Sequence, residues 1–309
     1  MTPSLRDALR PAHVSADELA ACIGLISDTH FGDRLDALPD AVSDVFRGVD
    51  LILHAGDVGK LAVLDELGRL APVVAVHGND ERFEETQREL PYQQVVSVAG
   101  VRIVLTHAHY PDLAQEMESR KDDTWAPKLE RRASFGQRAG ARIVVYGHTH
   151  IPTDVEYQGV RLVNPGAIAS GHLTVHQHRK TVALLHIHTD GSSSVVHVDL
   201  SQPTRPTRIE IDWAAGFRSA AVQFQRPILT EDARAAYDRL VSSARSSGPY
   251  VFNAVRNAVR TECMRCWSGE QEVLATHDLV RAIERAVELT PAVRATLVSA
   301  LTADSVPRS

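Results

Sequence analysis

The sequence has few cysteines, few lysines and no long apolar run. Three cysteines among 309 residues are too few for a framework of disulfides. No apolar stretch approaches the roughly 20 residues needed to cross a bilayer, and the N-terminus lacks the apolar core of a signal peptide. We therefore expect a cytoplasmic protein that does not associate with membranes. Lysine is scarce, with 4 residues against 29 arginines, and we attribute this bias to genome composition.

What is present is the composition of a globular protein. Hydrophobic residues make up 44% of the chain and charged residues 23%, both ordinary values, and the length suits one large or two modest domains. The formal net charge is −6. From residue 205 onward, 14 arginines stand against 12 acidic residues, which is no electrostatic footprint for nucleic acid. Charge therefore gives no support for nucleic-acid binding by this tail.

Five short fragments that carry carboxylate, carboxamide or imidazole side chains each follow an apolar run rich in β-branched residues. The fragments are Ser27-Asp28-Thr29-His30, Gly56-Asp57, Gly78-Asn79-Asp80, Thr106-His107-Ala108-His109 and Gly147-His148-Thr149-His150. The apolar runs span residues 22–26, 51–53, 73–76, 103–105 and 143–145. Ligands presented at strand ends can converge on one side of a sheet, so we expect these fragments to meet there.

The spacing and the chemistry of the fragments both favour a metal site. Side chains two residues apart on an extended segment share a face, so Asp28 and His30 can aim at one spot. His148 and His150 can do the same. The donor set has no thiolate and suits manganese, iron, nickel or zinc. A single His-x-His or Gly-Asp would be typical of a strand or a turn, whereas five such fragments in order predict a metal site.

The set resembles the calcineurin-like metallophosphoesterase superfamily, with its pattern D-x-H, G-D, G-N-x-D/E, H-x-H and G-H-x-H. The spacing is most similar to the small bacterial and archaeal phosphodiesterases of that superfamily, and Val163-Asn164-Pro165-Gly166 also resembles the segment that follows G-H-T-H there. The resemblance covers about residues 22 to 200. It implies an α+β fold in which a two-sheet sandwich is flanked by helices, and the strand-rich second half of that region favours the same class.

The resemblance implies a centre of two divalent metal ions, with manganese preferred to iron, nickel or zinc. One ion would be held by Asp28, His30, Asp57 and His150, and the other by Asp57, Asn79, His107 and His148. Asp57 would then bridge the two ions. Such a pair, about 3.5–4 Å apart, clamps the oxygens of a phosphoryl displacement and activates a bridging water as the nucleophile.

Two residues are candidates for the catalytic step at the leaving group. Asp80 stands where many superfamily members carry a histidine, and nearby dications favour the charged form of a carboxylate, which is a poor proton donor. His109, two residues beyond His107, is the nearest alternative acid, although a structural hydrogen bond would explain it equally well. We therefore expect a preference for leaving groups that need little protonation.

Three functions fit these patterns. The first is a binuclear metal-dependent hydrolase of phosphate esters, with diesters favoured over monoesters as substrates. The second is a scaffold that has the fold without activity, against which the seven intact ligand positions argue. The third is a nuclease that uses the C-terminal region to bind nucleic acid. The sequence does not indicate the oligomeric state.

Turn residues and linkers divide the chain into three parts. We expect an N-terminal helical extension over residues 1–21, in which Ser15 and Glu18 form a capping box. The metallophosphoesterase-like catalytic domain should span residues 22–202, and an appended C-terminal helical domain residues 203–309. In this last domain Leu279, Ile283 and Val287 recur at helical spacing and predict one buried stripe.

Other segments allow two interpretations each. The polar segment from Pro111 to Gly140 is either a cap over the metal site or, as we favour, a solvated helix that connects two strands. Six histidines between residues 172 and 197 have no carboxylates in their immediate cluster, and Cys263-x-x-Cys266 has no second cysteine pair. We interpret the histidines as strand residues and the two cysteines as part of a helical core.

Overall fold

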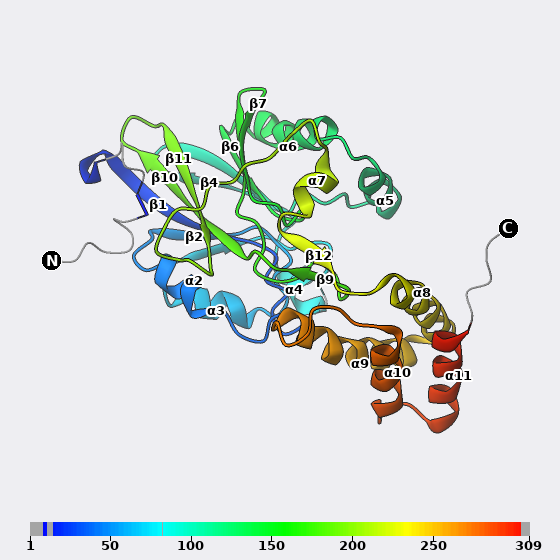
Figure 1. Ribbon diagram of the computed structural model, residues 1–309. Helices are drawn as coiled ribbons and strands as arrows, with labels where there is room; N and C mark the ends of the chain where they lie inside the picture. Colours follow the sequence, from blue (N-terminus) through cyan, green and yellow to red (C-terminus); the bar gives the residue numbers. More distant parts are fainter. Residues whose placement is uncertain (1–8, 11–14, 82, 304–309) are drawn as a thin grey trace. The chain divides into compact units, whose positions relative to one another are not determined.

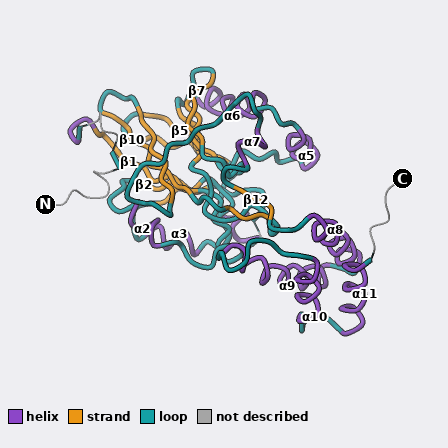
Figure 2. The backbone as a smooth tube through the Cα atoms, in the orientation of Figure 1, coloured by secondary structure: helices purple, strands orange, loops and turns teal. Residues whose placement is uncertain are grey.

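The computed structural model describes residues 9–10, 15–81 and 83–303 and divides the chain into two compact units (Figures 1 and 2). The first unit comprises residues up to 170 together with 179–225, and the second comprises residues 171–178 together with 226–309. The expected boundary between residues 202 and 203 therefore falls inside the first unit. The functional assignment of the domains stays a prediction.

The first unit contains two five-stranded mixed sheets. In sheet order, the strands of one are β11 (Ser193–Asp199), β10 (Thr181–His188), β1 (Leu19–Ile26), β2 (Leu51–His54) and β3 (Val73–Ala75). Those of the other are β4 (Gln93–Val98), β5 (Val101–Thr106), β6 (Ile143–Tyr146), β8 (Val160–Asn164) and β7 (Thr153–Tyr157). Strands β1, β2 and β3 run parallel, as do β5, β6 and β8, so each sheet has a common carboxyl edge at its centre.

The two sheets pack face to face, and helices cover their outer faces. In β1, Ile23 and Leu25 point into the core that both sheets share, whereas Cys22 and Ile26 point to the opposite face, as the two-residue repeat of a strand requires. Helices α2 (Asp40–Val45) and α3 (Ala62–Gly68) contribute to the core on that outer face. On the other sheet, α6 (Ala126–Ala139) and α7 (Phe217–Ala221) do the same. The α+β sandwich flanked by helices is therefore confirmed.

Two tight hairpins join the antiparallel pairs of the second sheet. Ala99 and Gly100 connect β4 to β5, and Gln158 and Gly159 connect β7 to β8. All four have positive φ, 47° and 78° in the first turn and 51° and 75° in the second. Two consecutive left-handed residues match the twist of paired strands, which explains why a glycine occupies the second position of each turn.

The N-terminal segment differs from the expected helical extension over residues 1–21. Ser15 does donate to the Glu18 carboxylate, from its backbone nitrogen at 2.8 Å and its hydroxyl at 2.9 Å. The turn that follows, η1, is only a 3-10 helix over Ala16–Glu18, and β1 begins at Leu19. Pairing of Leu19 with His188 in the sheet ends the helix there. Residues 1–8 and 11–14 lie outside the described residues.

The segment from residue 111 to 140 forms two helices, α5 (Leu113–Lys121) and α6. The expectation of a solvated connecting helix is wrong for α6, because it buries Leu129, Ala133 and Phe135 against the second sheet. Gly140, with φ of 60°, ends α6 in the left-handed conformation. Helix α5 is mostly exposed, and Glu116 is its one buried residue.

The second unit is a helical domain with its own core. Its helices are α8 (Glu231–Ser246), α9 (Pro249–Trp267), α10 (Thr276–Arg285) and α11 (Pro291–Thr302). Leu279 and Ile283 are buried as expected, but Val287 is 88% exposed because α10 already ends at Arg285. Short strand β9 (Val175–Gln177) pairs with β12 (Gln225–Pro227). Among the described residues, no helix has both the length and the apolar character needed to span a bilayer.

Candidate metal centre

The predicted fragments lie at the carboxyl ends of parallel strands. Asp28 follows β1 by two residues, Asp57 follows β2 by three, and His107 follows β5 directly. The G-H-T-H fragment begins at Gly147, directly after β6. Helix α4 (Glu84–Glu89) begins after the fragment that follows β3. The strands thus bring side chains more than 100 residues apart in sequence to one place.

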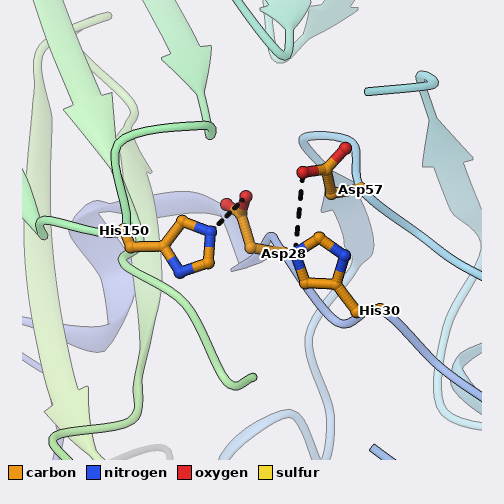
Figure 3. A group of neighbouring side chains, drawn as sticks. All are labelled: Asp28, His30, Asp57 and His150. Atoms are coloured by element: carbon orange, nitrogen blue, oxygen red, sulfur yellow. Dashed lines mark ion pairs between the residues drawn. The ribbon is translucent and has the colours of Figure 1, made fainter. Parts of the chain in front are cut away.

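Four buried side chains form a group that could hold one metal ion (Figure 3). They are Asp28, His30, Asp57 and His150, and each offers a ligand atom within 4.8 Å of the others. Nε2 of His150 lies 3.0 Å from Oδ1 of Asp28, and Nε2 of His30 lies 3.6 Å from Oδ2 of Asp57. Oδ1 of Asp28 is buried and accepts no hydrogen bond in the described part of the chain, so the site fits a cation.

A second set of predicted ligands meets the first at Asp57. Nε2 of His107 lies 3.3 Å from Oδ2 of Asp57 and 3.2 Å from Oδ1 of Asn79. The same Asp57 oxygen therefore faces His30 on one side and His107 on the other. His148 lies beside them, with its ring centroid 5.1 Å from that of His107, but its Nε2 contacts Oε1 of Glu116 at 2.8 Å. The structure thus brings six of the seven predicted ligands into contact and places the seventh against an acid.

The backbone of these fragments is strained. Left-handed φ angles occur at five of the predicted ligands, and they are 55° at Asp28, 43° at His30, 51° at Asp57, 72° at His148 and 60° at His150. Each such residue costs of order 1–3 kcal/mol and persists where the surrounding structure enforces it. A Cβ atom at Gly78 would collide with the Asp57 carboxylate, and one at Gly147 with Ser27. The glycines of G-N and G-H are therefore needed for close approach.

The acids and imidazoles of the cluster shift one another's pKa values. Although burial opposes it, the Asp57 carboxylate raises the pKa of His107 to about 9. Burial, reinforced by the Arg34 guanidinium, lowers the pKa of His30 to about 3. Burial would raise the pKa of Asp28, but His150 and His107 lower it to about 2. The His107 imidazole and the Asp57 carboxylate thus stabilise each other's charged forms.

Glu81 is a site residue that the sequence analysis did not single out. Its carboxylate accepts hydrogen bonds from the backbone nitrogens of Val58, Gly59 and Gly78, each at 2.9 Å. It thereby ties the loop after β2 to the loop after β3. Burial and the nearby Asp57 raise its pKa. The signal was available, because Glu81 occupies the D/E position of G-N-x-D/E.

Asn164 supports the G-H-T-H loop in a similar way. Its Nδ2 donates to the carbonyl of Gly147 at 2.9 Å and to the Thr149 hydroxyl at 3.0 Å, and its Oδ1 accepts from Gly166 N at 2.8 Å. All of these polar groups are buried within the first unit. The resemblance of the Val163-Asn164-Pro165-Gly166 segment therefore has a structural counterpart, a carboxamide that holds the loop of two ligands.

The two candidate catalytic residues occupy different surroundings. The Asp80 carboxylate is paired with Arg34, whose guanidinium also lies 3.2 Å from Nε2 of His30. The ring centroid of His109 lies 5.6 Å from that of His107 and 6.3 Å from that of His148. Burial and the neighbouring imidazoles lower the pKa of His109 to about 3. The imidazole of His109 therefore resists protonation.

The weaker sequence patterns lie outside this cluster. Several histidines between residues 172 and 197 make structural contacts. His172 contacts the Thr174 hydroxyl at 2.9 Å, His188 the Ser194 hydroxyl at 2.9 Å and His197 the Asn164 carbonyl at 2.8 Å. Among the residues that the structure describes, these histidines join no group of three or more acids, histidines and cysteines close enough to hold a metal ion. Cys263 and Cys266 are buried in the core of the second unit, as expected.

Residues 22–190 match the calcineurin-like phosphoesterase superfamily domain. Since the match spans more than half of the chain, the protein belongs to this superfamily. Twelve further residues, 191–202, separate the end of the match from residue 203, where the C-terminal domain was expected to begin.

The chain is also similar to individual proteins over about half of its length or more. A probable metallophosphoesterase of Methanothermobacter thermautotrophicus is 38% identical over 153 residues, which cover 49% of this chain and 80% of that protein. A phosphodiesterase of Methanocaldococcus jannaschii is 27% identical over 165 residues, with coverage of 49% and 86%. A predicted phosphoesterase from Streptococcus pneumoniae has been solved, and it is 19% identical with a TM-score of 0.42 over 60% of this chain and 92% of that one.

Proposed function

We propose that the protein is a hydrolase of phosphate diesters that works with two divalent metal ions. The observation that carries this proposal is the position of Asp57. Its Oδ2 lies 3.6 Å from Nε2 of His30 and 3.3 Å from Nε2 of His107. A carboxylate with an imidazole on either side can serve two ions, and two ions suit phosphoryl transfer.

The residues would divide into two ligand sets. The first ion would be held by Asp28, His30, Asp57 and His150, and the second by Asp57, Asn79, His107 and His148. Oxygen and nitrogen donors without thiolate favour manganese, with iron, nickel and zinc as alternatives. When bound, the two ions supply Lewis-acid stabilisation to the phosphoryl oxygens and lower the pKa of a coordinated water.

Arg34 and His109 would contact the substrate. Arg34 is buried, with 2% of its side chain exposed, and its guanidinium lies beside His30, where it could hydrogen-bond a phosphate oxygen. His109, a neutral imidazole, would donate a hydrogen bond toward the leaving group. Asp80 would hold Arg34 in place.

A diester fits this site better than a monoester for two reasons. The Asp33 and Asp80 carboxylates are both paired with Arg34. They partly neutralise the charge of its guanidinium, which would otherwise attract the second negative charge of a monoester. The relative from Methanocaldococcus jannaschii is named a phosphodiesterase. Both reasons favour a substrate that brings a single negative charge.

Metal analysis combined with two chromogenic substrates tests the proposal. The purified protein should bind two manganese ions per chain and hydrolyse bis(p-nitrophenyl) phosphate faster than p-nitrophenyl phosphate. Chelation should abolish the activity and manganese should restore it. Two bound ions without hydrolysis of either ester would favour the inactive scaffold instead. Faster hydrolysis of the monoester would overturn the diester assignment alone.

A further inference from the structure

Helix α5 exposes apolar side chains and buries an acidic one, the reverse of the usual pattern for a surface helix. Leu113 is 73% exposed and Met117 is 50% exposed, whereas Glu116 is the one residue of the helix that is buried, at 5% exposure. A buried carboxylate loses its hydration and is tolerated only when hydrogen bonds or charges replace it. The helix therefore contacts the rest of the first unit through its acid, and through the Ser119 and Lys121 carbonyls that accept from Lys128 and Arg218, rather than through an apolar stripe.

The Glu116 carboxylate connects two of the predicted ligand loops. Its Oε2 accepts a hydrogen bond from the backbone nitrogen of Tyr110 at 3.0 Å, directly after the His-Ala-His fragment. Its Oε1 accepts from Nε of Arg120 at 2.8 Å and from Nε2 of His148 at 2.8 Å. Each oxygen of the buried acid thus has a donor, and one donor is a predicted metal ligand.

The contact determines which nitrogen of His148 is available to a metal. A carboxylate accepts a hydrogen bond, so Nε2 of His148 carries the hydrogen and Nδ1 keeps its lone pair. His107 shows the complementary arrangement. Its Nδ1 donates to the carbonyl of Ala55 at 2.8 Å, which leaves Nε2 to face Asn79 and Asp57. Metal-binding histidines ordinarily have their second nitrogen fixed in this way.

We propose that Glu116 is a positioning residue that holds the Nε2–H of His148 and so presents Nδ1 of His148 to the second metal ion. The inference rests on the proposed binuclear function. It gives α5 a role in the site, because the binding of the second ion then depends on the docking of this helix through its acid. Loss of the carboxylate should weaken the second ion more than the first, because the predicted ligand that Glu116 contacts in the described part of the chain is His148.

Manganese titrations of Glu116→Ala and Glu116→Gln test the proposal. In Glu116→Ala the affinity for the second ion should fall by roughly 10–100-fold, with the first ion unchanged. Glu116→Gln keeps an oxygen that accepts from His148 and should lose less. Glu118→Gln is the matched control, because Glu118 lies on the same helix, is 75% exposed and forms its ion pair with Lys121, on the same helix. It should titrate like the parent protein.

Cobalt-loaded protein gives a readout that a purely structural role would not change. The visible absorption of Co²⁺ reports the geometry of its ligands, so the band of the second ion should change in Glu116→Gln while the band of the first ion stays as in the parent protein. Two ions bound by Glu116→Ala with parent affinity and spectrum would overturn the inference. If the parent itself fails to bind two ions, the proposed function is wrong, and this result is seen before any variant is made.

Discussion

The guanidinium of Arg34 and the carboxylate of Asp80 form an ion pair beside the predicted metal ligands. The backbone nitrogen of Asp80 also donates to Oδ1 of Asp57 at 2.9 Å. The position at which many superfamily members carry a histidine thus holds an acid that is engaged with a buried arginine. A carboxylate engaged in this way accepts hydrogen bonds and has no proton to offer a departing alkoxide.

The first prediction concerns Asp80→His. Rates measured across aryl phosphodiesters of graded leaving-group pKa should fall steeply in the parent as the leaving group becomes more basic. In Asp80→His the slope should flatten, because an imidazole can donate a proton. A flat dependence in the parent would show that an efficient acid is already present. Asp80→Asn, which adds no acid, serves as the control and should keep the steep slope.

Asp57→Asn tests the bridging role directly. An amide oxygen cannot neutralise two dications, so most of the bound metal should be lost and hydrolysis should fall by more than the ~10–100-fold typical of residues outside the ligand set. Metal content per chain and turnover of a chromogenic diester are the measurements. Near-normal turnover with two ions retained would contradict the assignment. Asp65→Asn, a substitution on α3 outside the predicted ligand sets, provides a control.

Glu81→Gln should destabilise the two loops that the carboxylate joins. Glutamine offers one acceptor oxygen to three backbone donors, so at least one N–H loses its partner at a cost of roughly 1–3 kcal/mol. Urea unfolding of the metal-free protein measures this loss, and a manganese titration measures the expected weakening of metal binding. An unchanged unfolding midpoint would show that the loops do not depend on Glu81. Glu84→Gln, at the start of the following α4, is a suitable control.

Local patterns predicted the strands and the polar side chains that meet at their ends, but not the residues that hold those side chains in place. Asp28, His107 and the other ligand fragments follow strands whose apolar runs can be read directly. Glu81 could have been found from the family pattern. Glu116 could not, because its burial reverses the apolar and polar faces of α5 and arises only when that helix meets the G-H-T-H loop. Similarly, Leu19 joins β1 because a partner strand from residue 181 onward reaches it.

The buried thiols of the second unit should be unreactive in the folded protein. Burial raises the pKa of Cys266 to about 11 and raises that of Cys263 as well. Since the thiolate is the reactive form, both should be modified at least about tenfold more slowly by a disulfide reagent near neutral pH than in urea. Mass spectrometry after timed alkylation measures each thiol separately. Fast modification of either cysteine without urea would contradict the burial of α9.

The stability of the first unit should depend on pH through His197. Its ring is 5% exposed and donates from Nε2 to the carbonyl of Asn164 at 2.8 Å. Burial lowers the pKa of His197, so the unfolded chain binds a proton at higher pH than the folded chain does. The free energy of unfolding should therefore decrease as the pH falls below about 6.5, the ordinary value for histidine.

His197→Gln separates this contribution from those of the other histidines. The amide can still donate to the Asn164 carbonyl but does not titrate, so the change in unfolding free energy between about pH 7.5 and about pH 5.5 should be smaller than in the parent. Urea unfolding in the presence of a chelator measures it without a contribution from released metal. His277→Gln is the control, because His277 is 76% exposed and its replacement should leave the pH dependence as it is. An identical pH dependence in His197→Gln and the parent would mean that His197 has the same pKa in the folded and the unfolded chain. That result would contradict the effect of its burial against the Asn164 carbonyl.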